Sequence, residues 1–303
     1  MRWRNSSNLE WLRGLPGVEA DHPLARHTSF NIGGPADFFV EAPDGPSLAH
    51  FADGALERGI PFRVLGAGTN LLISEAGMEG LVARAVDREF RRDGDRVYGA
   101  AGLKMMRLAR LAADANLLGF EFAIGIPGTV GGAVYQDAGC WGTEVRDVLD
   151  EVTGHAPGSG PRTWKPAELS LRYRSSAFRD GDLKGQLVTG AWFHLRPGDG
   201  AAAKRQMVLW TAERLRTQPI RSKSCGSVFS NPPGDSAGRL VEAAGLKGLS
   251  QGGARISTTH SNFIENTGGA TAADVRMLIA KAIAEVSRQF GVTLELEVEV
   301  TGR

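Results

Sequence analysis

A chain of 303 residues is long for a single hydrophobic core, so two or three domains are expected. Basic and acidic residues almost balance, 35 against 34, and neither sign forms a long run. This balance argues against a protein that binds nucleic acid or a membrane surface. Glycine is the unusual component: its 40 residues are about 13% of the chain, nearly twice the usual ~7%. So many glycines indicate tight turns and close backbone approaches, such as those that wrap a ligand.

The two cysteines and the N-terminal stretch exclude several other classes of protein. Cys140 and Cys225 have no CxxC spacing and no histidine cluster near them, which predicts buried apolar residues rather than a disulfide framework or a metal site. Residues 1–15 lack the apolar core of a signal peptide, and no apolar run reaches 18 residues. We therefore expect a cytoplasmic protein.

The predicted elements are mixed and lack a regular strand–helix–strand period, which indicates an α+β fold. Apolar spacing and end signals predict helices over 45–59, 104–116, 201–216, 236–244 and 271–290. Strands are predicted over 62–65, 71–73, 81–86, 96–99, 145–153, 187–195, 254–257, 262–265 and 293–301. Thr271 and Asp274 form the pattern of a capping box at the start of the last helix. A change in composition near Pro219 predicts a domain boundary there.

The stretch "PFRVLGAGTNLLIS" (61–74) resembles half of a dinucleotide-binding fingerprint, because Gly66 and Gly68 end a predicted strand. A Rossmann turn would continue into a helix whose N-terminus carries the pyrophosphate. Here a second strand-like run follows Asn70, so a phosphate would be held by backbone N–H groups of the turn itself. A glycine-rich turn without any ligand is the alternative.

The segment "GIPGTVGGAVYQDAGCWG" (125–142) is too rich in glycine to be one helix or one strand. An ordinary surface loop would be polar, whereas this segment carries Ile124, Ile126, Val130 and Val134 in or beside it. It is therefore predicted to be buried, and its backbone polar groups need partners. A large planar ligand with a diphosphate would supply them.

Two further segments carry candidate polar side chains. In "SLRYRSSAFR" (170–179) an extended backbone would place Arg172 and Arg174 on one face and Tyr173 on the other. Arginine is suited to clamp a carboxylate or a phosphate, although a solvated edge strand is the alternative. In "RSKSCGSVFSNPPG" (221–234) Ser227 is no triad nucleophile, because the G-x-S-x-G pattern is absent. Its hydroxyl could deliver a proton, or it could only cap a turn.

The C-terminal stretch "VTLELEVEV" (292–300) alternates with period two. As a strand it would place Glu295, Glu297 and Glu299 on one face and apolar side chains on the other. Adjacent carboxylates raise one another's pKa, which suits a general acid. A wet edge strand is the alternative interpretation.

Taken in order, these segments resemble the bacterial UDP-N-acetylenolpyruvoylglucosamine reductases of peptidoglycan precursor synthesis. The matching pieces are "HTSFNIGGPADFFVEAPD", "LGAGTNLLI", "GIPGTVGGAVYQDAGCWG", "YRSSAF", "GSVFSNP", "AGRLVEAAGLKG", "GGARISTTHSNFIEN" and "LELEVEV". They run across nearly the whole chain and resemble the shorter type of the family, which lacks an extra substrate-covering loop. The resemblance implies a flavoprotein of the vanillyl-alcohol-oxidase type, with two FAD-binding subdomains (1–80, joined by 292–303, and 81–200) and a substrate-binding domain (201–291).

The resemblance also implies the chemistry: NADPH reduces a tightly bound FAD, and the reduced flavin N5 passes hydride to the enolpyruvyl ether of a UDP-sugar. A monomer is expected. Arg174 would polarise the substrate carboxylate, Glu297 would assist, and Ser227 would give the proton, while Tyr173, Asn231 and His260 fall where the family contacts the sugar nucleotide. The implied cofactor-binding residues are Gly66, Ala67, Gly68, Thr69, Asn70, Leu71, Gly125, Ile126, Pro127, Gly128, Thr129, Gly131, Gly132, Ala133 and Asp137.

Three positions depart from the family pattern: Ser230 replaces a basic residue, Asp137 an amide, and Cys225 a common alanine. They put affinities rather than the reaction class in doubt. Two other functions stay open: a different FAD oxidoreductase of the same cofactor fold, such as a carbohydrate or aldonolactone oxidase, and a UDP-sugar-binding regulator without catalysis. The intact Arg174, Ser227 and Glu297 argue against the regulator.

Overall fold

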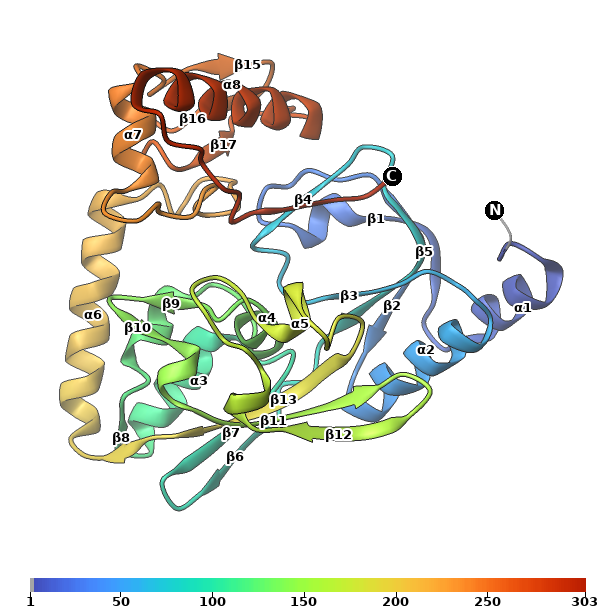
Figure 1. Cartoon of the computed structure of the whole chain (residues 1–303). Helices are drawn as coiled ribbons and strands as arrows, with labels where there is room; N and C mark the ends of the chain where they lie inside the picture. Colours follow the sequence, from blue (N-terminus) through green and yellow to red (C-terminus); the bar gives the residue numbers. More distant parts are fainter. Residues whose placement is uncertain (1–2) are drawn as a thin grey trace. The chain divides into compact units, whose positions relative to one another are not determined.

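The computed structural model describes residues 3–303, which divide into two compact units (Figure 1). Unit 1 contains residues 3–20, 38–67 and 80–212, and unit 2 contains residues 21–37, 68–79 and 213–303. Neither unit is a continuous stretch of sequence, because the chain passes repeatedly from one to the other. The finer division predicted from the sequence, with boundaries at 80, 200 and 291, stays a prediction.

The main sheet of unit 1 has five antiparallel strands in the order β12-β11-β13-β7-β6. Its strands are β6 (Phe90–Asp93), β7 (Arg96–Ala100), β11 (Leu149–Ala156), β12 (Gly160–Trp164) and β13 (Leu187–His194). Helices α3 (Met105–Asp114) and α4 (Val130–Tyr135) lie on one face of the sheet (Figure 1). Leu108 of α3, Val134 of α4 and Phe193 of β13 are fully buried in the core between them.

A second sheet has the order β1-β2-β5-β3, and the apolar core that packs on it consists of residues of unit 1. The sheet consists of β1 (Glu19–Pro23), β2 (Pro35–Ala42), β3 (Phe62–Leu65) and β5 (Met78–Ala85), and helices α1 (Ser6–Gly14) and α2 (Gly45–Glu57) pack on its apolar residues. Helix α2 begins where its sequence signals predict, because the Asp44 carboxylate accepts the N–H of Ser47. Its buried residues Leu48, Phe51 and Ala55 follow helical spacing.

The remaining elements of unit 1 are short, apart from one long helix. They are β8 (Leu117–Leu118), η2 (Glu121–Gly125), β9 (Gly139–Cys140), β10 (Thr143–Glu144), η3 (Val145–Asp147), η4 (Pro166–Glu168), α5 (Ala177–Asp180) and β14 (Arg196–Pro197). The long helix is α6 (Gly200–Thr217), whose residues up to 212 belong to unit 1 and the rest to unit 2. Trp141, in the turn between β9 and β10, stacks on Trp210 of α6 with ring centroids 4.5 Å apart. This stack attaches the β9–β10 hairpin to the helix.

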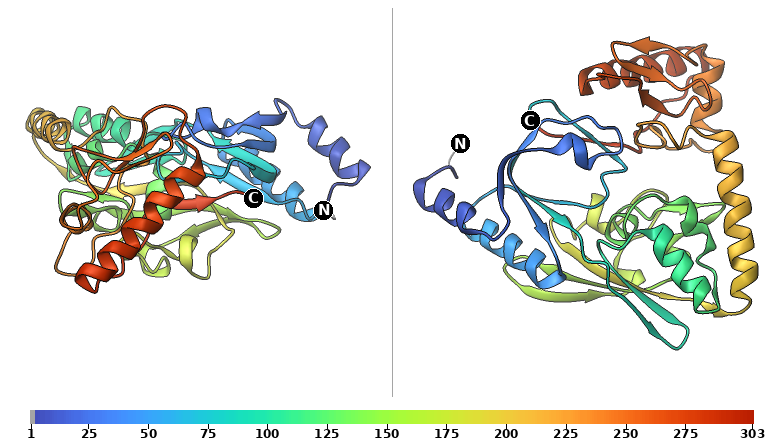
Figure 2. Two further views of the ribbon diagram at one scale, coloured as in Figure 1. Left: turned by 90° about the horizontal axis from the view of Figure 1, so that it is seen from above. Right: turned by 180° about the vertical axis from the view of Figure 1, so that it is seen from behind.

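Unit 2 is built around an antiparallel sheet, β15-β16-β17, with α8 across one face of it (Figure 2). Its elements are η1 (Leu24–His27), β4 (Leu71–Ile73), α7 (Ala237–Ala243), β15 (Ser250–Gln251), β16 (Ala254–Ile256), β17 (Ile264–Asn266), α8 (Ala272–Phe290) and β18 (Glu299–Thr301). Buried side chains of α7, α8 and the sheet form its core. The C-terminal strand β18 pairs in parallel with β4.

Most predicted helices and strands are confirmed within a few residues, and so is the strand, rather than a helix, after the glycine turn at 66–68. Cys225 is buried in the core of unit 2, as predicted, while Cys140 is half-buried. Within residues 3–303, no helix is long and apolar enough to cross a bilayer.

Three predictions were wrong. The strand predicted over 145–153 begins only at Leu149, after a 3-10 turn. The strand predicted over 293–301 is regular only at Glu299–Thr301, and Leu296, on its predicted inner face, is 37% exposed. Residues 172–176 form a tight turn rather than an extended chain. Hydrogen bonds to other segments outweigh the local alternation in the first two cases, and in the third the mutual backbone bonds of Arg172 and Ser175 close the turn.

Replacing Thr271 tests the start of α8. Its hydroxyl accepts the N–H of Asp274 at 3.0 Å, and the Asp274 carboxylate accepts the N–H of Thr271 at 3.0 Å. Thr271→Ala removes one half of this capping box, so the free energy of unfolding should fall by about 1 kcal/mol. Urea denaturation followed by circular dichroism measures the loss. Thr293→Ala, at an exposed position outside the helix, is the control and should change little.

Candidate functional site

A cavity of about 270 Å³ opens in unit 1 beside the glycine turn. Gly66, Ala67 and Thr129 form part of its wall, so three predicted cofactor residues from two distant segments come together there. Four basic side chains also line it, and none of them was predicted: Arg84, Arg88, Lys104 and Arg107. A wall that combines a glycine turn with cationic groups favours an anionic ligand such as a diphosphate.

Thr129 indicates that a polar ligand group belongs in this cavity. The residue is 5% exposed, and its hydroxyl oxygen has no hydrogen-bond partner in the described structure, although it precedes helix α4 where such a hydroxyl often caps the helix. A Cβ built on Gly66 would lie only 2.7 Å from this oxygen. Glycine at 66 therefore keeps open the space in front of the hydroxyl. A buried hydroxyl without a partner costs free energy that a bound ligand would recover.

The second half of the glycine turn belongs to unit 2 and approaches other backbone closely. Gly68 has φ +61°, and a Cβ there would lie 2.0 Å from the carbonyl oxygen of His27. The carbonyl of Gly68 accepts the N–H of Ser29 at 3.1 Å, and the Ser29 hydroxyl is a further buried polar group without a partner in the described residues. Only glycine fits position 68, for reasons of both conformation and space.

The apolar side chains in and beside the segment 125–142 are buried, as predicted, whereas Pro127, Gly132 and Gly142 are exposed. Ile124, Ile126, Val130 and Val134 are each at most 7% exposed. The middle of the segment forms the short helix α4, whose first N–H groups bond to carbonyls of the neighbouring loop at Ala101 and Leu103. The other predicted cofactor residues in this segment lie beside Thr129 in sequence, at Gly125, Ile126, Pro127, Gly128, Gly131, Gly132 and Ala133.

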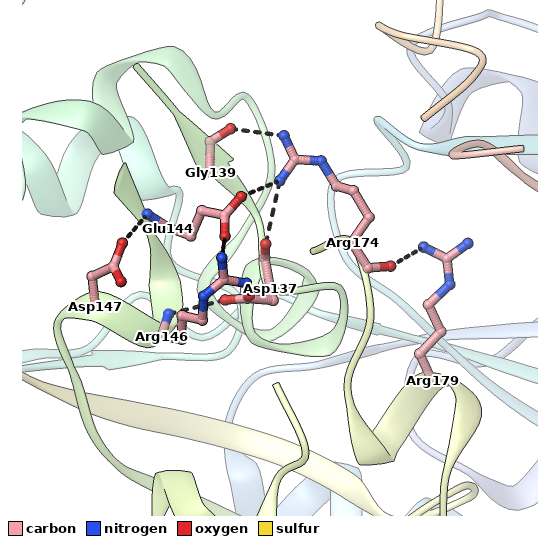
Figure 3. A network of polar contacts seen from close by, with 7 residues as sticks. All are labelled: Asp137, Gly139, Glu144, Arg146, Asp147, Arg174 and Arg179. Carbon is pink, nitrogen blue, oxygen red and sulfur yellow. Dashed lines mark hydrogen bonds and ion pairs between the residues drawn. The ribbon is translucent and has the colours of Figure 1, made fainter. Parts of the chain in front are cut away.

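Arg174 is held in unit 1 by two backbone carbonyls of this same segment (Figure 3). Its guanidinium donates to the carbonyl of Asp137 at 3.3 Å and to that of Gly139 at 3.1 Å. Its backbone lies in the left-handed region, with φ 57°, inside the tight turn that Arg172 and Ser175 close by mutual backbone hydrogen bonds. Arg172 and Arg174 therefore do not share one strand face, and the predicted extended geometry is wrong.

Asp137, predicted to bind the cofactor, forms an ion pair with Arg146. Its carboxylate is fully buried and accepts both the backbone N–H and a guanidinium N–H of Arg146. Burial raises the pKa of Asp137, and Arg146 opposes that rise. The family departure noted at this position thus has a partner that the sequence did not indicate.

Ser227 and Glu297 lie on neighbouring backbone segments of unit 2. The N–H of Glu297 donates to the carbonyl of Val228 at 2.9 Å, and the N–H of Ser230 donates to the carbonyl of Glu295 at 2.9 Å. Because the segment 295–298 follows 228–230 in this irregular way, it does not join a regular sheet. This pairing explains why the predicted strand is short.

Asn262 and Asn70 hold these two segments. The buried side chain of Asn262 donates to the carbonyl of Phe229 and accepts its N–H, at 2.8 and 2.9 Å. Asn70, predicted to bind the cofactor, donates instead to the carbonyl of Glu297 at 3.0 Å. The cofactor turn and the candidate catalytic segment are therefore joined directly within unit 2.

The three predicted substrate contacts have different surroundings. Tyr173 is 43% exposed next to Arg174, whose guanidinium lies 4.8 Å from the centre of its ring. The exposed Asn231 accepts the N–H of Ala237 and so supports the start of α7. His260 is half-buried, and burial lowers its pKa. Burial has the opposite effect on the Cys225 thiol, two residues before Ser227, whose pKa it raises.

Several residues of the site were missed at the sequence level. The basic residues of the cavity come from β5, the loop after it and the start of α3, so no local spacing connects them. Asn262 could have been suspected from "THSNFIEN", where a buried run carries an amide. Glu144, which contacts Arg174, and Arg146, which contacts Glu144 and Asp137, gave no signal in the sequence, because isolated charges next to a glycine loop are common.

The fold and the cavity define an FAD-binding protein. The family model described as "FAD binding domain" matches residues 36–155, and a model described as "UDP-N-acetylenolpyruvoylglucosamine reductase, C-terminal domain" matches residues 218–301. The match to the FAD-binding model confirms the predicted cofactor fold. The glycine turn at 66–68, the unpartnered Thr129 hydroxyl and the basic wall of the cavity fit the diphosphate of FAD.

Relatives of known name extend the match to the whole chain. A UDP-N-acetylenolpyruvoylglucosamine reductase of Anaeromyxobacter sp. is 43% identical over 94% of this chain and 89% of its own length. One of Phenylobacterium zucineum is 41% identical over 97% of this chain and 100% of its own. The crystal structure of the Thermus caldophilus reductase superposes with a TM-score of 0.78 at 35% identity, covering 93% of this chain and 97% of that one. The chain belongs to the UDP-N-acetylenolpyruvoylglucosamine reductase family.

Thr129→Val tests the assignment of the cavity. Valine keeps the shape of threonine but removes the unpartnered hydroxyl, so the apoprotein should be as stable as the wild type or more so. FAD should nevertheless bind about tenfold more weakly, a loss of ~1.4 kcal/mol. Titration of the apoprotein with FAD, followed by flavin fluorescence, and urea denaturation measure the two effects.

Thr163→Val on the exposed strand β12 is the control. If Thr129→Val weakened the apoprotein and left the FAD affinity unchanged, the hydroxyl would be a structural group and the cavity would be misassigned.

Proposed function

We propose that this protein reduces the enolpyruvyl ether of UDP-N-acetylglucosamine to UDP-N-acetylmuramate, with NADPH as the reductant. The observation that carries the proposal is that Ser227 and Glu297 lie on adjacent, backbone-paired segments in a chain similar along its whole length to reductases of this name. The predictions of a cytoplasmic location, a monomer and a role in peptidoglycan precursor synthesis belong to the same proposal.

The bound FAD would supply hydride chemistry, taking hydride from the nicotinamide and giving it to the vinyl CH₂ carbon of the substrate. The residues proposed to hold it are those of the cavity, with Gly66 and Thr129 facing the diphosphate and Arg107 and Lys104 supplying positive charge. Gly68, Thr69 and Leu71 continue the turn, and Asn70 attaches that turn to the C-terminal segment.

The role proposed for Arg174 follows from where negative charge develops. When the vinyl carbon gains hydride, the carbon that bears the carboxylate becomes electron-rich, and that carboxylate takes up part of the charge. A guanidinium that donates two hydrogen bonds in a fixed direction stabilises such a charge more in the transition state than in the bound substrate. Glu297 would assist through the polarisation of the same carboxylate.

Ser227 is proposed to complete the reaction with a proton to this electron-rich carbon. A serine hydroxyl is a weak acid in water, but proton transfer to a carbanion-like carbon is downhill, so the side chain needs mainly to be aimed. Gly226, with φ +81°, sets the direction of the backbone just before Ser227. Asn262 then fixes Val228, whose N–H it accepts at its backbone carbonyl, and Phe229, which bonds to its side chain. Protonation gives the product, and solvent restores the proton of the hydroxyl.

The visible spectrum separates this function from its alternatives. A yellow protein that NADPH bleaches, and that the enolpyruvyl nucleotide recolours without oxygen, is the proposed reductase. Recolouring by oxygen alone would indicate an oxidase of the same cofactor fold, and a colourless protein would indicate a UDP-sugar-binding regulator. NADH in place of NADPH tests the preference between the two nucleotides.

Ser227→Ala should separate the two half-reactions. The variant should bind FAD and be bleached by NADPH at a rate close to that of the wild type, because both events precede protonation. Anaerobic recolouring by the substrate should slow by at least ~10²-fold, the usual scale for a lost general acid. Rapid-mixing absorbance measures both rates, and Ser227→Cys should recover part of the loss. Equal impairment of the two half-reactions would make Ser227 a structural residue.

The carboxylates of the C-terminal segment should differ in importance. Glu297→Gln should lower turnover by more than about tenfold, or ~1.4 kcal/mol. Glu295→Gln should change it little, because the Glu295 side chain is exposed and the segment uses its backbone carbonyl instead. Steady-state turnover of the two variants checks this, and equal losses would show that the wrong carboxylate has been chosen.

A further inference from the structure

Arg174 belongs to a connected set of charged side chains in unit 1, most of them buried (Figure 3). Its guanidinium lies 3.7 Å from a carboxylate oxygen of Glu144, the other oxygen of Glu144 contacts Arg146, and Arg146 in turn bonds to Asp137. We propose that Glu144 is a positioning residue that aligns the guanidinium of Arg174, and that Arg146 and Asp137 hold Glu144 in place. The inference rests on the proposed function, because Arg174 needs a fixed alignment if it stabilises the substrate carboxylate.

A tight hairpin brings Glu144 to this position. Gly139 and Glu144 are direct cross-strand partners in β9 and β10, so the carbonyl of Gly139 and the carboxylate of Glu144 approach the same guanidinium. The turn between them places Trp141 at φ 53° and Gly142 at φ 77°, the left-handed pair that a two-residue hairpin needs. A Cβ on Gly139 would lie 2.3 Å from Cγ of Glu144, so only glycine leaves room for this carboxylate.

Burial limits the positions that these charged side chains can adopt. The side chains of Asp137, Glu144 and Arg174 are 0%, 13% and 16% exposed. Burial raises the pKa of the Glu144 carboxyl, and the two arginines oppose that rise. Asp137 and Glu144 balance Arg146, which is 37% exposed, and Arg174, so the loss of one charge would leave a buried partner without compensation. Such a set restricts each member to a narrow range of positions.

The backbone of Arg174 is restricted as well. Arg179 donates from its side chain to the carbonyl of Arg174 at 3.0 Å, and Ser176 donates to the carbonyl of Tyr135 at 2.6 Å. These bonds support a backbone conformation that is strained for any residue other than glycine. A long arginine side chain is thus held at its backbone by one group of contacts and at its guanidinium by another. Glu144 places a carboxylate oxygen 3.7 Å from that guanidinium.

Glu144→Gln tests the inference, because glutamine keeps the shape and removes the charge. Anaerobic recolouring of the reduced flavin by the enolpyruvyl nucleotide should slow about tenfold, since a small misplacement of a catalytic group is costly. Bleaching by NADPH should stay within about twofold and FAD content should be unchanged, whereas the urea midpoint should fall, because Arg174 loses a compensating charge. Glu151→Gln is the matched control: it neutralises another half-buried carboxylate of unit 1, one that is paired with Lys165.

A double-mutant cycle shows whether Glu144 acts through Arg174. Once Arg174→Ala has removed the guanidinium, Glu144→Gln should slow recolouring no further. Glu144→Asp keeps the charge on a shorter arm and should give an intermediate rate, which also provides the test if the glutamine variant fails to fold. Additive losses, equal slowing of both half-reactions, or a rate equal to that of Glu151→Gln would overturn the inference. A wild-type flavin that the nucleotide fails to recolour would overturn the proposed function first, and this inference with it.

Discussion

Buried backbone polar groups must be hydrogen-bonded, and the segments that carry the proposed catalytic residues Arg174, Ser227 and Glu297 are irregular. The segments 66–70, 172–176, 226–230 and 295–298 belong to no long strand or helix. Their N–H and C=O groups bond instead to one another or to side chains such as Asn70 and Asn262. The site residues are therefore positioned by a hydrogen-bond pattern specific to this chain, and the high glycine content follows, because irregular segments can approach so closely only where side chains are absent.

Electrostatics provides the second level of organisation around the proposed reaction. A carboxylate buried as deeply as that of Asp137 is costly unless a cation accompanies it, and removing one partner of such a pair typically costs about 3–5 kcal/mol. Arg146 is that cation, and it also contacts Glu144. Family members with an amide at position 137 would not need the same cation. The departure from the family pattern at Asp137 thus comes with a compensating residue nine positions later, and it leaves the carbonyl of residue 137 available to Arg174.

The cavity in unit 1 illustrates how a cofactor site combines residues with and without a sequence signal. Gly66 and Thr129 could be named in advance, since they lie in glycine-rich stretches typical of ligand-binding loops. The basic residues beside them come from three separate places in the chain and are recognisable only once the sheet and α3 have brought them to one wall. The unpartnered hydroxyl of Thr129 is equally a property of the folded chain, because its burial depends on its neighbours.

The sequence by itself determined the local elements and the family. Helical spacing and capping signals predicted α2, α3 and α8 closely, because these depend on neighbouring residues and on one apolar face. The ordered motifs indicated the family that the relatives confirm. Only the tertiary structure decided the geometry of the segments around Arg174, Ser227 and Glu297. There, bonds between residues far apart in sequence, such as Asn70 with Glu297, outweigh the period-two pattern that predicted strands. A local pattern records which side chains are apolar, but it does not record which distant carbonyl will satisfy a buried N–H.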